Sequence, residues 1–288
     1  MSVVRSPSEL EKIPRAVAIG TFDGVHRGHK AAIAAAKSAG LRSTVVTFDP
    51  HPRLVLGYDV QLLTTLPRRI ELLEEAGPDD ILVLEFTEEL SGLEPEEFVA
   101  RVLEPIGTET VVAAGTFRFG RGRKGDVELL RRIGLEVVDV PLVAGVSSSR
   151  IRELLAAGEM REAAALLGRP HEVEGTVVSG DQRGGTLGFP TANLAVGPHL
   201  LVPAYGIYAG AALGGRAAIS IGVNPHYGGN ERRIEAFLLD FEGDLYGKEL
   251  RIELWERLRE ERAFESEEDL VRQIALDVEA ARGTIRPY

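Results

Sequence analysis

The stretch GTFDGVHRGHKAAI, residues 20–33, follows directly on the apolar run AVAI and leads into an alanine-rich segment. AVAI is typical of a buried strand, and residues 30–40 are typical of a helix that ends at a glycine. The polar loop between them carries two of the six histidines of the chain. In an open parallel sheet, ligands bind beyond the carboxyl ends of strands. This stretch therefore predicts a strand–loop–helix unit and a binding site in its loop.

The same alternation continues to about residue 155 and predicts a Rossmann-like α/β domain, a parallel sheet with flanking helices. Continuous Val, Ile and Leu runs, rather than strict alternation, fit strands that are covered on both faces. The predicted strands are 43–49, 79–86, 110–115 and 135–143, and the predicted helices are 66–77, 94–107 and 126–134.

The second half has a different pattern. Two short helices, separated by Gly158 and ended by Gly168, precede Pro170. Strand-like runs and turn signals then predict an antiparallel β-barrel or sandwich, of which we favour the barrel, followed by a C-terminal helix capped by Ser266. These runs are 172–180, 206–213, 216–223, 233–241 and 249–258. We place the domain boundary so that one domain is 1–168 and the other 169–288.

Composition narrows the class of protein. The 288 residues contain no cysteine, which excludes disulfides, thiolate metal sites and cysteine nucleophiles. With 33 basic and 44 acidic residues the formal charge is −11, which argues against non-specific nucleic-acid binding. No run is long and apolar enough for a membrane span, and residues 1–15 lack the pattern of a signal peptide. We expect a cytoplasmic protein without nucleic-acid or membrane partners.

The first candidate site is the loop at 20–29. Gly20, Gly24 and Gly28 allow close approach of the backbone, and a helix N-terminus attracts phosphate. His26 and His29, one helical turn apart, can donate hydrogen bonds to phosphate oxygens as charge builds in a transition state. The alternative is that both histidines merely cap the helix and face water.

A second motif, SSSRIR at 147–152, offers serine hydroxyls and an arginine fork for phosphate. Ser148, Ser149 and Arg150 are its candidate ligands, although an ordinary serine cap with a solvated arginine is the plain alternative. Taken with residues 20–29, it is similar to the motif pair of the nucleotidyltransferase superfamily.

The barrel half carries TLGFPTANL at 186–194. On an extended backbone Thr191 and Asn193 point to the same face, where a hydroxyl and an amide suit Mg²⁺ and the phosphates that it bridges. The preceding segment 179–185, with Gly180 and Arg183, is a candidate flap over phosphates. A polar turn with a β-bulge is the alternative.

Glu235 lies in an otherwise apolar strand, where burial of a carboxylate costs free energy. Phe237 and Phe241 share its face by alternation. We interpret Glu235 as a base that accepts a proton from an alcohol attacking a phosphate. Simple pairing with Arg232 or Arg233 is the alternative.

These motifs together resemble the bacterial bifunctional riboflavin kinase and FMN adenylyltransferase family, over essentially the whole chain and in the family's order. Further matching blocks are VTFDPHP (46–52), FRFGRGRKGD (117–126), IGVNP (221–225) and DLYGK (244–248). The resemblance implies two ATP-dependent reactions, riboflavin to FMN in the barrel domain and FMN to FAD in the α/β domain.

The resemblance also assigns roles. In the barrel, Thr191 and Asn193 match the positions that hold Mg²⁺ and ATP phosphates, with Gly180 and Arg183 in the flap, and Glu235 matches the catalytic base. In the α/β domain, His26 and His29 match the phosphate-binding histidines. The remaining matches there are Gly20, Thr21, Phe22, Asp23 and Gly24 for ATP, Ser148, Ser149 and Arg150 for phosphate, and Thr116, Phe117 and Phe119 for flavin.

The chain departs from the family pattern at a few positions. Thr116 stands where an Asp or Asn is usual, Gly185 where an arginine is expected, and His226 where threonine is usual. Ala204 and Tyr205 precede GIY, where an aspartate is frequent. These departures leave two alternatives open, an enzyme with only one of the activities and a non-catalytic flavin- or nucleotide-binding module.

Overall fold

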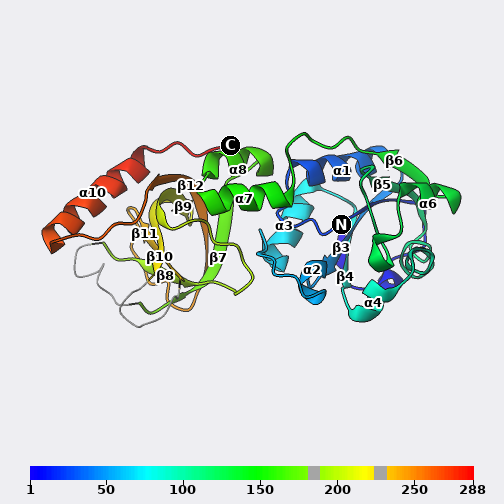
Figure 1. Ribbon diagram of the computed structural model, residues 1–288, viewed down its shortest axis with the longest axis horizontal. Coiled ribbons are helices and arrows are strands. Elements are labelled where there is room, and N and C mark those ends of the chain that lie inside the picture. Colours follow the sequence, from blue (N-terminus) through cyan, green and yellow to red (C-terminus); the bar gives the residue numbers. More distant parts are fainter. Residues whose placement is uncertain (181–188, 224–231) are drawn as a thin grey trace. The chain divides into compact units, whose positions relative to one another are not determined.

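The structure is a computed structural model that describes residues 1–180, 189–223 and 232–288 (Figure 1). The chain forms two compact units. One contains Met1–Val60 and Leu66–Val146, and the other contains Gln61–Thr65 and Ser147–Tyr288. Among the described residues, no helix has the length and apolar character needed to cross a membrane.

The first unit is built on a six-stranded sheet in which every pair is parallel, in the order β1-β4-β3-β2-β5-β6. The predicted α/β class is confirmed. The edge strand β1 was not predicted from the sequence. The strands are β1 Ser2–Val4, β2 Arg15–Ile19, β3 Arg42–Asp49, β4 Asp80–Glu85, β5 Thr108–Ala113 and β6 Glu136–Asp139.

Both faces of this sheet are covered, as the continuous apolar strands predict. Val17 of β2 packs into one apolar cluster, whereas its neighbours Ala16 and Ala18 pack into another. Helix α1 (Arg27–Ser38) contacts β2, β3 and β5. The other helical segments are α2 Pro52–Val55, α3 Leu66–Ala76, α4 Glu88–Gly92, α5 Pro95–Phe98, α6 Val127–Arg132, the 3-10 turns Pro7–Glu9 and Arg121–Arg123, and a π-helical turn Val99–Leu103.

The order of the strands fixes the position of the first site. From β2 the chain runs through β3 to β4 on one side, and it then returns to place β5 and β6 on the other side. The topological switch point therefore lies between β2 and β5, where open parallel sheets bind ligands. The loops that begin at Gly20 and Ala114 leave the carboxyl ends of these two neighbouring strands.

The second unit is a closed antiparallel barrel, in the order β10-β11-β8-β7-β12-β9, with β9 pairing back to β10. The predicted barrel is confirmed. The short β8 falls in a segment that the sequence marked only as extended. The strands are β7 His171–Val178, β8 Ala192–Ala195, β9 Gly206–Ala212, β10 Gly215–Val223, β11 Arg232–Leu238 and β12 Glu249–Arg259.

Among its described residues, the second unit contains the helices α7, α8 and α10. Helices α7 (Ser148–Ala157) and α8 (Met160–Leu167) end at Gly158 and Gly168, both in the left-handed conformation. Apolar side chains of both helices join the barrel core, so packing groups residues 147–168 with the barrel, whereas the division predicted from the sequence lies after 168. Helix α10 (Glu267–Gly283) packs on β9, β10 and β12, and Ser266 caps it as expected (Figure 1).

Candidate active sites

The loop after β2 has an uncommon backbone. Phe22 and Val25 have positive φ angles of 50° and 39°, and both side chains are buried. Such a conformation is costly for a bulky or β-branched residue, and it persists only where the surrounding structure enforces it. Gly24, at φ 81°, adopts the same region without that cost. Asp23 is also buried, so the loop is a fixed element rather than a solvated turn.

The two histidines lie at the start of α1. The Nδ1 atom of His26 accepts a hydrogen bond of 3.2 Å from the backbone N–H of His29, so His26 caps the helix. When His26 is neutral, its proton therefore lies on Nε2. The two rings are stacked, with centroids 3.6 Å apart. His26 therefore caps the helix, as the alternative interpretation states, but its side chain is buried and does not face water.

His29 is held in its neutral form. Burial lowers the pKa of His29 well below its ordinary value, and the nearby charges of His26 and Arg69 lower it further. Within the described residues its Nδ1 atom is buried and has no hydrogen-bond partner. A buried, unpartnered ring nitrogen at a helix N-terminus is a polar group available to a ligand.

Arg69 of α3 is a member of this site that the sequence analysis missed. Its guanidinium is buried and donates hydrogen bonds of 3.0 Å to the carbonyl of Thr21 and 2.9 Å to that of Phe48. Burial lowers the pKa of Arg69, while the charges of Asp23 and Asp49 oppose that shift. The sequence did contain a signal for Arg69. This basic residue lies on the same face of the predicted helix as Leu72 and Leu73, where an apolar side chain is expected.

The loop after β5 carries the three predicted flavin residues in different environments. Thr116 is exposed, Phe117 is half-buried and Phe119 is buried. The rings of Phe117 and Phe119 stack with centroids 5.6 Å apart. Phe119 also pairs through its backbone with Gly125. Thr116 and Phe117 are therefore accessible at the surface, and the buried ring of Phe119 packs against that of Phe117.

The serine motif begins α7. The side chain of Ser147 caps this helix by accepting a 3.1 Å hydrogen bond from the N–H of Arg150. The guanidinium of Arg150 is exposed and pairs with Glu153 at 3.0 Å. Ser148, Ser149 and Arg150 belong to the second unit. Val146, the last residue of the first unit, lies close to Gly28, since a Cβ built on Gly28 would be 3.9 Å from its Cγ1.

In the barrel, Asn193 of β8 and Glu235 of β11 are direct partners in the antiparallel register. Their neighbours Ala192, Ile234 and Ala236 point into the barrel core. Asn193 and Glu235 therefore project from the outer face, on which Thr191 also falls by the alternation of the extended chain.

Gly180 lies against this pair. A Cβ added to Gly180 would come within 2.3 Å of the Nδ2 atom of Asn193, so only glycine fits there without a shift. The other predicted flap residue, Arg183, lies outside the described residues, as do Gly185 and His226.

Glu235 is half-buried rather than desolvated, with a side chain 35% exposed. Arg233 approaches it at 3.9 Å, which is the pairing considered as an alternative. On the same face, the rings of Phe237 and Phe189 meet edge to face with centroids 5.4 Å apart. The sequence analysis missed Glu261, whose carboxylate lies against Gly222. Burial raises the pKa of Glu261. The charge of Arg259 lowers this pKa, and the charge of Glu235 raises it.

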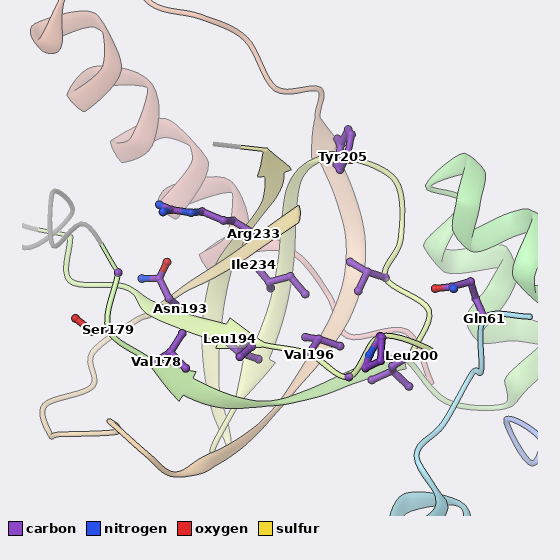
Figure 2. A pocket seen from close by; sticks show the side chains of 15 residues that line it. Gln61, Val178, Ser179, Asn193, Leu194, Val196, Leu200, Tyr205, Arg233 and Ile234 are labelled. Atoms are coloured by element: carbon purple, nitrogen blue, oxygen red, sulfur yellow. The ribbon is translucent and has the colours of Figure 1, made fainter. Parts of the chain in front are cut away.

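A cavity of about 650 Å³ opens beside this pair (Figure 2). Its polar lining includes Ser179, Gly180, Asn193 and Arg233. The part of the cavity near Leu200 is lined by apolar side chains. Glu235 is not among the described residues that line the cavity. Figure 2 shows Asn193 and Gln61 at opposite ends of this cavity. The volume is of the size that binds an organic ligand such as a nucleotide.

Comparisons with known proteins match successive parts of the chain to two families. Residues 8–152 match the family model described as FAD synthetase, and residues 167–285 match the one described as riboflavin kinase. A bifunctional riboflavin kinase/FMN adenylyltransferase from Listeria monocytogenes is 37% identical, covering 95% of this chain and 93% of its own.

The chain belongs to this bifunctional family. Relatives of the same description from Bacillus subtilis and Escherichia coli are 34% and 33% identical and cover 94% and 98% of this chain. A solved structure described as a macrolide-efflux protein from Streptococcus pneumoniae is 30% identical and covers 98% of this chain and 99% of its own. Its TM-score is 0.88, so it has the same fold.

The geometry can now be assigned to the two family domains. The FAD synthetase domain contains the strained loop, the stacked histidines and Arg69. The riboflavin kinase domain contains Asn193, Glu235 and most of the residues that line the cavity. Within the described residues, no group of three or more His, Asp or Glu side chains could hold a metal ion. The hydroxyl and amide oxygens of Thr191 and Asn193 still fit Mg²⁺, which keeps several waters and binds substrate phosphates with few protein ligands.

Proposed function

We propose that the protein makes FAD from riboflavin in two steps. The kinase domain transfers the γ-phosphoryl group of ATP to the terminal ribityl hydroxyl of riboflavin, which yields FMN and ADP. The FAD synthetase domain then joins AMP from a second ATP to FMN, which yields FAD and pyrophosphate. Because both steps use ATP, we place them in the cytoplasm. The observation that carries this proposal is the pairing of Asn193 with Glu235 in a chain that matches both family models.

In the kinase step Glu235 accepts the proton of the attacking hydroxyl while its oxygen bonds to the γ-phosphorus and ADP leaves. The carboxylate is the form of Glu235 that can accept this proton. Thr191 and Asn193 would hold Mg²⁺, which would neutralise charge on the phosphates. Gly180 keeps the backbone of the flap against Asn193, and Arg183 of the same flap binds phosphate.

In the adenylyl step an oxygen of the FMN phosphate attacks the α-phosphorus of ATP, and pyrophosphate leaves. This reaction needs no covalent enzyme intermediate, so the protein contributes position and charge. His26 and His29 donate to phosphate oxygens beside the N-terminus of α1. The loop Gly20–Gly24, with Thr21, Phe22 and Asp23, cradles ATP. Ser148, Ser149 and Arg150 form the second phosphate clamp, and Thr116, Phe117 and Phe119 bind the flavin.

The switch-point geometry supports the flavin assignment, because the loops after β2 and β5 leave adjacent strands.

The test is to incubate the purified protein with riboflavin, ATP and Mg²⁺ and to separate the flavins by chromatography. Formation of FAD is the expected result. FMN without FAD would show that only the kinase is active, and unchanged riboflavin that binds tightly would show a binding module. FMN supplied directly tests the second step independently of the first.

A further inference from the structure

We propose that Gln61, a residue from the N-terminal half of the sequence, binds the adenine of ATP in the kinase cavity and makes that site selective for a 6-aminopurine. This inference rests on the proposed kinase function. It concerns a residue outside residues 167–285, which match the riboflavin kinase model. Gln61 lines the cavity together with residues of the barrel (Figure 2).

Gln61 is placed by a segment that is built into the second unit. Leu62 donates a 2.6 Å hydrogen bond to the carbonyl of His199 and accepts one of 2.7 Å from the N–H of Leu201. The next side chain, Leu63, is buried in the barrel core. This parallel bridge makes residues 61–65 part of the wall beside Leu200.

The backbone of Gln61 is fixed from two further directions. Its carbonyl accepts a 2.6 Å hydrogen bond from Nε of Arg152 in α7. Farther along the segment, the hydroxyl of Thr65 donates to Glu174 of β7 at 2.5 Å. A side chain on such a fixed backbone loses little freedom when it binds a ligand. Within the described part of the chain, the amide of Gln61 makes no hydrogen bond of its own.

The layout of the cavity indicates what meets this amide. Asn193 and the close-packed Gly180 mark the phosphate end, and Gln61 lies at the other end with apolar side chains such as Val196 between them (Figure 2). A nucleoside triphosphate held by its phosphates at Asn193 directs its base toward Gln61. Riboflavin must approach Glu235, which does not line the cavity, so the base rather than the flavin ring occupies this end.

The chemistry of the amide matches adenine. Adenine presents its 6-amino donor beside a ring-nitrogen acceptor, and a glutamine amide presents an acceptor beside a donor. Guanine carries a carbonyl at the same position, so the amide oxygen would face another acceptor. Gln61 can therefore form two hydrogen bonds with adenine, each contributing on the order of 1 kcal/mol.

The experiment measures kcat/KM for riboflavin phosphorylation with ATP and with purine riboside triphosphate, which lacks the 6-amino group. We expect the wild-type protein to prefer ATP about tenfold. In Gln61→Ala and in Gln61→Met, which keeps the length without the amide, the preference should fall to within about twofold. Glu279→Gln, at an exposed position of helix α10, is the control and should retain the preference.

The outcomes separate the two proposals. Wild-type protein that does not phosphorylate riboflavin would refute the kinase function itself. A wild-type preference that persists in both Gln61 variants would refute the role of Gln61 alone, as would its loss in Glu279→Gln to the same degree. The rate of FMN-to-FAD conversion, measured on the same preparations, should be unchanged in all three variants, and thermal unfolding like that of the wild type shows that the barrel of each is folded.

Discussion

Asn193 and Glu235 stand directly opposite each other across the antiparallel strands β8 and β11. Side chains in such a pair have Cβ atoms about 5 Å apart on the same face of the sheet. The register therefore places the proposed ligand for Mg²⁺ and phosphate next to the proposed base, as the proposed phosphoryl transfer requires.

Replacing the base should stop the kinase alone. We expect Glu235→Gln to lower the rate of FMN formation by roughly 10²- to 10⁴-fold, because the amide cannot accept the proton of the hydroxyl. FMN-to-FAD conversion should be unaffected. Glu279→Gln, at an exposed position of α10, is the matched control and should leave both rates unchanged. Parallel loss of both activities in Glu235→Gln would contradict separate sites.

A methyl group at Gly180 should disturb the kinase through Asn193. Since the added Cβ would come within 2.3 Å of the Asn193 amide, Gly180→Ala must displace that side chain. We expect a KM for ATP that rises at least tenfold in riboflavin phosphorylation and a normal rate of FAD formation from FMN. Gly283→Ala, where a Cβ meets nothing within 4 Å, serves as the control. A normal KM in Gly180→Ala would argue against a role of Asn193 in holding ATP.

The histidine pair should act on the second reaction only. We expect His29→Ala to lower FAD formation from FMN by at least 10²-fold with FMN formation intact, as for loss of a transition-state hydrogen-bond donor. The control is His199→Ala, whose side chain is exposed.

The lowered pKa of His29 also predicts a pH profile. Because burial, His26 and Arg69 keep its imidazole neutral, kcat/KM of the free enzyme should show no loss from His29 deprotonation between pH 6.5 and 8. A decline with a midpoint near pH 6.5 that disappears in His29→Ala would mean that the imidazolium is required.

A buried ion-pair network at the opposite end of the parallel sheet should govern acid stability. Burial alone would raise the pKa of Asp80, but hydrogen bonds from Arg42, Ser2 and Arg15 outweigh it and hold the pKa far below its usual range. The stabilisation is present above about pH 4 and is lost as the pH falls below that value. Asp80→Asn leaves the buried Arg15 without its 2.5 Å partner, which should cost about 3–5 kcal/mol at pH 7.

Urea denaturation of the wild type and Asp80→Asn at pH 7, 4 and 3 measures this effect. The difference in the free energy of unfolding should shrink as the pH falls. Asp240→Asn removes an exposed ion pair with Arg282 and should change stability little. A difference that stays constant with pH would show that Asp80 contributes through packing rather than charge.

His171 should make the free energy of unfolding depend on pH in a second, less acidic range. Burial, with the charge of Arg169, lowers the pKa of His171 from 6.5 to about 3. Below pH 6.5 the unfolded chain takes up a proton that the folded barrel does not, so stability falls as the pH falls toward 3. Between pH 6.5 and 5 this loss is about 2 kcal/mol. His171→Leu should flatten that part of the stability curve, and an unchanged slope would exclude His171 as its origin.

The amino-acid sequence by itself determined the two element patterns, the helix ends at Gly158 and Gly168, and the Ser266 cap. These features follow from hydrophobic period and local backbone preference, which act over a few residues. The sequence also marked both histidines, Asn193 and Glu235 as candidates, because each polar side chain stood out against its surroundings. Short strands such as β1 and β8 could not be predicted from the sequence, because three or four residues show too little periodicity.

Only the tertiary structure decided which of these residues meet. The opposition of Asn193 and Glu235 depends on strand register, and the burial of Arg69 beneath Thr21 depends on how α3 packs. The presence of Gln61 in the wall of a cavity built from residues more than a hundred positions later depends on one parallel bridge, between Leu62 and Leu200. Such long-range contacts are fixed by closure of the whole core, and no local pattern encodes them.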